Sequence, residues 1–175
     1  MNKRPPTVTI PAILFLIFEI LALLGVITNG LTMMLASKPD GVLMANPAVA
    51  AMNASPEFLL YSKIMVPITL VLAALGIAVG IGLFKGKELA RTTGIKLAVL
   101  KIVTVLVGTW MTLTYLNPQI AKTMAAMGGQ SQAMMQSTMQ AAMMAGAIGG
   151  ALFGIAVGVA FIILLTRPSA VAFCR

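Results

Sequence analysis

The chain has 175 residues, of which 59% are hydrophobic and only 9% charged, with a formal net charge of +8. Soluble globular domains carry about 25% charged residues, so we predict that a lipid bilayer is the main solvent of this chain. It contains no histidine and a single cysteine, Cys174, which excludes Ser/His/Asp and Cys/His triads, histidine-based metal sites and internal disulfides. We therefore predict no catalytic residue, no metal site and no cofactor.

Four stretches have the roughly 20 mostly apolar residues that a membrane-spanning helix needs; they cover about 10–34, 61–84, 97–116 and 143–166. They predict an all-α fold, an integral membrane four-helix bundle, with one transmembrane domain over 1–175. The first stretch is too long for the apolar region of a signal peptide and is followed by a poor cleavage site, so we expect it to remain as a span.

Glu19 lies well inside the first span, where a charged carboxylate costs at least ~2.5–3.5 kcal/mol. Lys101, about one turn into the third span, is its predicted partner, and Asn29 is a second polar group of the first span. One interpretation is a buried pair that fixes helix register, with Asn29 bonded to Thr104 or Thr109. The other is an ion or proton path from Glu19 to Asn29. We favour the structural role, because a conducting path needs polar groups through the full depth.

The segment between the first two spans, 35–60, is predicted to lie outside the membrane. It holds a KPDG turn signal and two proline dipeptides, Asn46-Pro47 and Ser55-Pro56, each of which is typical of the start of a short helix.

Basic residues predict the orientation. Nine of the twelve lysines and arginines fall at the N-terminus, in the loop 85–96 with Lys101 just beyond it, or after the fourth span. The remaining three are Lys38, Lys63 and Lys122. The positive-inside rule then places both termini and the loop 85–96 in the cytoplasm, for a protein of the inner membrane. The basic surplus faces anionic lipid headgroups, and we expect no nucleic acid as a partner.

The second outer segment, 117–142, is rich in methionine. Met135, Met139 and Met143 recur at every fourth position, which predicts a helix that continues into the fourth span. Thioether clusters bind Cu(I), but dedicated copper sites usually add histidine or cysteine. We favour a face for packing or for a partner, because methionine adapts to irregular apolar contacts.

Glycines form a stripe along the fourth span and a shorter strip in the second. The stripe recurs at every fourth position, and therefore on one helix face: Gly146, Gly150, Gly154, Gly158, with Gly76 and Gly80 in the second span. In lipid, helix association depends on close approach of backbones. We predict a glycine zipper that packs against the second span or against a second copy of the chain.

The pentapeptide GIAVG occurs at 76–80 and again at 154–158, an offset of 78 residues. This repeat predicts that the bundle is a duplicated two-helix hairpin. Altogether, we expect a non-enzymatic multi-pass membrane protein, a scaffold or accessory subunit that acts through helix contacts. Its expected partners are the lipid bilayer and either a second copy or another membrane protein. The alternative is a small transporter or channel that uses Glu19.

Overall fold

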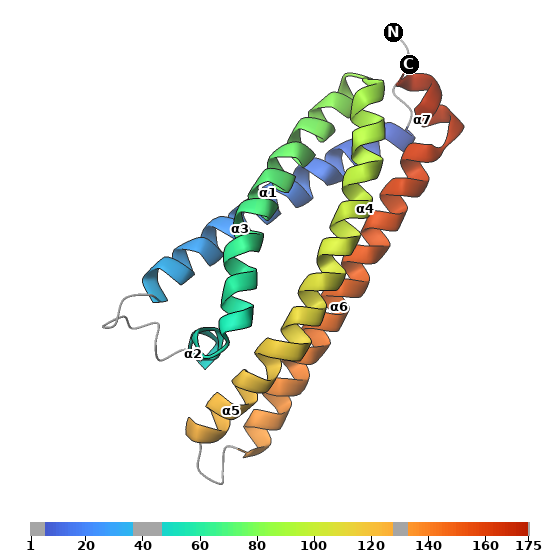
Figure 1. Ribbon diagram of the computed structural model, residues 1–175. Helices are drawn as coiled ribbons and strands as arrows, with labels where there is room; N and C mark the ends of the chain where they lie inside the picture. Colours follow the sequence, from blue (N-terminus) through green and yellow to red (C-terminus); the bar gives the residue numbers. More distant parts are fainter. Residues whose placement is uncertain (1–5, 37–46, 128–132, 175) are drawn as a thin grey trace. The chain divides into compact units, whose positions relative to one another are not determined.

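The computed structural model describes residues 6–36, 47–127 and 133–174, and every regular element in these ranges is helical (Figure 1). The elements are α1 (Pro6–Ala36), α2 (Pro47–Asn53), α3 (Pro56–Phe84), α4 (Glu88–Met111), a π-helical turn η2 (Thr112–Leu116), α5 (Asn117–Met127), α6 (Ala133–Thr166) and α7 (Pro168–Phe173). Four segments of the described residues are long and apolar enough to cross a membrane: Pro6–Thr28, Pro56–Phe84, Glu88–Thr123 and Ala141–Thr166. The chain is an all-α, multi-pass membrane protein.

Prolines mark the helix starts. Pro6, Pro47, Pro56 and Pro168 each stand at the first residue of a helix, where the missing amide hydrogen is not needed. The two proline dipeptides of segment 35–60 therefore lie at helix starts, although the second begins the long α3 rather than a short helix. The KPDG signal lies outside the described residues.

The third membrane helix is longer than hydropathy predicts. α4 begins at Glu88, so only Lys85, Gly86 and Lys87 of the expected loop 85–96 lie outside helices. Glu88 suits the first turn of a helix, because a negative charge there is stabilised by the helix dipole. At its other end α4 continues through η2 into α5, so part of the expected outer segment 117–142 is helical.

α6 runs without a break from Ala133 to Thr166, in agreement with the periodicity of the methionines. The side chains of Met135 and Met139 lie outside the described part, so a packing or partner-binding role of this face stays a prediction. The first half of the chain holds α1, α2 and α3, whereas the second holds α4, η2, α5, α6 and α7. The duplication itself stays a prediction.

The residues form two compact units, and each long helix contributes to both. Unit 1 comprises Met1–Ile27, Pro67–Thr104 and Gly154–Arg175. In it, α1, α3, α4, α6 and α7 pack around one apolar core, and the rings of Phe15 and Phe161 stack with their centroids 4.4 Å apart. A hydrogen bond of 2.9 Å between the hydroxyls of Thr7 and Ser169 joins the start of α1 to α7.

Unit 2 comprises Thr28–Val66 and Val105–Phe153. Within it α2 packs against α5, and Trp110 and Tyr115 make an edge-to-face ring contact with centroids 5.9 Å apart. Large apolar side chains cover the outside of both units, among them Leu21, Leu24 and Leu152. Such a surface is stable in the hydrocarbon of a bilayer, where an apolar side chain has no need of burial.

Candidate functional site

Glu19 is the most unusual residue of the core. Its exposed fraction is 1%, and it lies on α1 within the membrane-spanning part of unit 1. Lys101 of α4 donates a hydrogen bond from Nζ to Oε1 of Glu19, and the two side chains form an ion pair. The structure thus brings together the two charged residues that the sequence indicates as partners. Pairing lowers the large cost of a charge in a low-dielectric surrounding.

Gly76 of α3 completes the site from a third helix. A Cβ atom at this position would lie closer than 3.0 Å to the Cγ, Cδ and Oε1 atoms of Glu19. The missing side chain of Gly76 therefore makes the space that the carboxylate occupies. The sequence indicates Gly76 only as a packing residue, because a glycine inside an apolar span carries no sign of which side chain it faces.

The ion pair is asymmetric. Oε2 of Glu19 is buried and has no hydrogen-bond partner among the described residues. The side chain of Lys101 is 31% exposed, whereas that of Glu19 is 2% exposed. Chemically, Oε2 can accept a proton or a hydrogen bond from a small donor. Across the described ranges, no three His, Cys, Asp or Glu side chains come together as a cation site.

Asn29 belongs to α1 but its side chain lies outside the described part, and it falls in unit 2 whereas Glu19 falls in unit 1. The expected bond from Asn29 to Thr104 or Thr109 therefore stays a prediction. The hydroxyl of Thr104 donates to the carbonyl oxygen of Leu100 at 2.9 Å. The hydroxyl of Thr109 donates to the carbonyl of Val105 at 2.8 Å. Such bonds to the preceding turn satisfy a threonine hydroxyl within its own helix.

Two of the predicted packing glycines are closely packed in unit 1, but against helices other than those expected. A Cβ atom at Gly80 of α3 would lie 2.9 Å from Cγ of Leu16 on α1. One at Gly158 of α6 would lie 2.7 Å from Cγ1 of Ile102 on α4. Gly76 and Gly80 of α3 thus face α1, and Gly158 faces α4 rather than the second span. Hydropathy cannot show this, because it is the same on every face of these helices.

The other end of the glycine stripe is open. Gly146 and Gly150 are exposed, and an added Cβ atom at either would have no neighbour within 4 Å. Gly154, between them and Gly158, is half-buried. Of the predicted zipper, the structure therefore packs Gly158 and leaves Gly146 and Gly150 uncovered.

The geometry defines two features, a buried carboxylate held by one lysine and one glycine, and an uncovered glycine face on α6. Neither contains a nucleophile activated by a base, nor a phosphate-binding loop. Compared with models of known protein families, with curated proteins and with solved structures, the chain matches none of them.

Proposed function

We propose that the chain is a non-enzymatic membrane protein, a scaffold or accessory subunit that binds a partner through the open end of the α6 glycine stripe. The supporting observation is the contrast along one helix between Gly158, which is closely packed, and Gly146 and Gly150, which have nothing within 4 Å of an added Cβ. Small-residue faces allow close helix contact in lipid. The partner is a helix of a second copy or of another membrane protein.

Cysteine cross-linking tests this proposal. In a Cys174→Ser background, Gly150→Cys is compared with Leu152→Cys, which lies two residues away and on a different helix face. Leu152 is also strongly exposed, so both thiols are reachable from the membrane. We expect oxidation in native membranes to cross-link Gly150→Cys to a second copy or to a partner protein, and Leu152→Cys much less. Equal cross-linking of the two variants, or none, would reject the glycine face as a contact.

We also propose that both termini and the turn between α3 and α4 face the cytoplasm of the inner membrane. The hydrogen bond between Thr7 and Ser169 supports placing the start of α1 and α7 on the same side, and basic residues are concentrated there. In a Cys174→Ser background, Glu88→Cys should resist an impermeant thiol reagent in intact cells. Asn53→Cys, at an exposed position of the outer segment 35–60, should react. The opposite pattern would invert this orientation.

A second candidate, a small proton or ion transporter, is favoured by the free Oε2 atom of Glu19. A carboxylate with one bonded and one free oxygen can take up a proton while Lys101 holds its position. This function predicts pH-driven flux into liposomes that Glu19→Gln abolishes. The scaffold function predicts no flux above that of protein-free liposomes, and no change on Glu19→Gln.

A further inference from the structure

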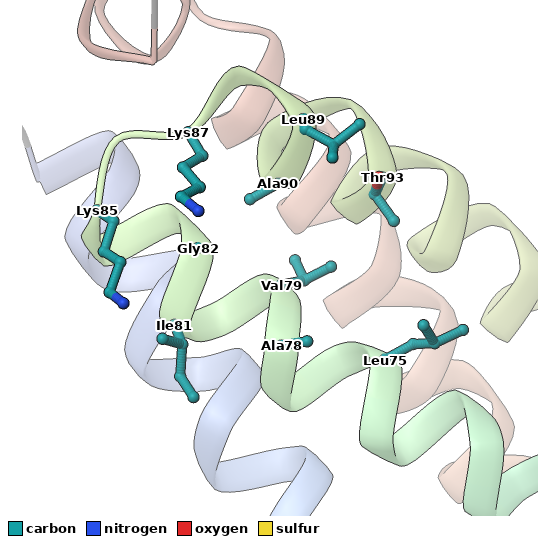
Figure 2. A pocket seen from close by; sticks show the side chains of 10 residues that line it. All are labelled: Leu75, Ala78, Val79, Ile81, Gly82, Lys85, Lys87, Leu89, Ala90 and Thr93. Atoms are coloured by element: carbon teal, nitrogen blue, oxygen red, sulfur yellow. The ribbon is translucent and has the colours of Figure 1, made fainter.

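A groove of about 250 Å³ lies between the end of α3 and the start of α4, in unit 1 (Figure 2). Its floor is formed where the two helices touch, by Val79, Gly82 and Ala90, all of which are buried. A Cβ atom at Gly82 would lie 2.6 Å from Cβ of Ala90. Gly82 therefore permits the close approach of the helices that defines the bottom of the groove.

The walls of the groove are apolar and uncovered. Leu75 and Ile81 of α3 are each 46% exposed, and Leu89 of α4 is 77% exposed. The groove belongs to two membrane-spanning segments, Pro56–Phe84 and Glu88–Thr123. We therefore expect these walls to be surrounded by lipid acyl chains.

Two lysines stand at one end of the groove. Figure 2 shows Lys85 and Lys87 on the turn between the helices, with Leu75 at the opposite end. Gly86 between them has a φ of +67°, a left-handed conformation that glycine adopts without strain. Both lysines are exposed, and neither forms an ion pair within the part of the chain that the structure describes. The adjacent Glu88 instead lies 3.7 Å from Arg91.

We propose that this groove binds one anionic phospholipid, with an acyl chain along Leu75, Ile81 and Leu89 and the phosphate between the ammonium groups of Lys85 and Lys87. Charge complementarity favours an anionic lipid, because the two unpaired lysines lie at one end of the groove and no acidic side chain lines it. The volume is smaller than that of pockets for drug-sized ligands and suits a flexible hydrocarbon chain better than a helix about 10 Å wide. The proposal is independent of the function proposed above.

The site is tested with the whole protein in neutral detergent. The protein is titrated with phosphatidylglycerol or phosphatidylcholine, and bound lipid is counted by native mass spectrometry. We expect one phosphatidylglycerol to bind at least tenfold more tightly than phosphatidylcholine. A basic residue near an anionic surface contributes roughly a fivefold change in affinity, so the double variant Lys85→Gln/Lys87→Gln should bind phosphatidylglycerol roughly 25-fold more weakly.

Two further variants separate the groove from general charge attraction. Lys63→Gln/Lys122→Gln removes the same charge from two exposed lysines outside the groove and should leave binding unchanged. Ala78→Phe fills the groove from an exposed lining position and keeps both lysines, so it should weaken phosphatidylglycerol binding at least fivefold. Equal affinity for the two lipids, an equal loss in both lysine variants, or full binding by Ala78→Phe would each overturn the proposal.

Discussion

Gly76→Ala is the smallest change that tests how the buried ion pair is held. The new methyl group would lie closer than 3.0 Å to three atoms of the Glu19 side chain. Carbon atoms pack best at about 3.5–4.0 Å, so the carboxylate must retreat by roughly 1 Å. Glu19 is buried and bonded to Lys101, so this retreat disturbs the buried ion pair.

We expect Gly76→Ala to lower the free energy of unfolding by about 1–3 kcal/mol, the usual cost of overfilling a packed site. Gly25→Ala is the matched control. Gly25 lies on α1 and, like Gly76, belongs to unit 1, but it has nothing within 4 Å of an added Cβ. Alanine forms helices better than glycine by up to about 1 kcal/mol. The control should therefore be neutral or slightly more stable than the parent protein.

Cys174 is a built-in reporter for this measurement. It is the only cysteine of the chain and belongs to the buried core of unit 1. A thiol reagent at fixed pH should therefore modify it only in molecules that have opened. The fraction modified, followed across mixed micelles of increasing sodium dodecyl sulfate content, gives the unfolding midpoint of each variant.

A second background makes the test specific to the carboxylate. In Glu19→Ala/Lys101→Leu, both charges and the atoms that face Gly76 are gone. There the Gly76→Ala change should be neutral or slightly stabilising, because the new methyl group no longer meets the carboxylate and alanine forms helices better than glycine by up to about 1 kcal/mol. The reasoning is refuted if Gly76→Ala is tolerated as well as Gly25→Ala, or if its cost persists in the background without Glu19.

Two of three other predictions use the same assay, and the third uses circular dichroism. Glu19→Leu should destabilise the protein by about 3 kcal/mol or more, because it leaves Lys101 unpaired. The double variant Glu19→Leu/Lys101→Leu should recover most of this loss, and failure to recover would show that the ion pair is not the cause. Gly158→Leu, which collides with α4, should unfold in milder detergent than Gly150→Leu, and equal midpoints would exclude Gly158 as a contact. Burial raises the pKa of the Cys174 thiol. The buried neutral thiol therefore makes its full contribution to stability below the ordinary thiol pKa of about 8.5, and this contribution is lost as the pH rises through the higher pKa of the folded state. Unfolding followed by circular dichroism should show a weaker decline in stability at high pH for Cys174→Ala than for the parent protein.

The number of membrane spans follows from the sequence, because it depends on the hydropathy of each stretch and not on contacts between helices. Transfer of apolar residues into lipid is nearly additive, so runs of about 20 such residues indicate four spans without knowledge of their neighbours. The cost of a carboxylate in hydrocarbon makes Lys101 the natural partner for Glu19. Composition likewise explains the absence of histidine-based sites.

The contacts between helices depend on the tertiary structure. In lipid, an apolar side chain is equally stable against hydrocarbon or against another helix, so hydropathy does not indicate which face packs. Hence the sequence shows a stripe of equivalent glycines, whereas the structure packs Gly158 on α4 and leaves Gly150 open. The same reason explains why only the structure shows Gly76 against Glu19, and the groove beside Lys85 and Lys87. Each of these requires two helices to meet at a particular rotation, which no single span encodes.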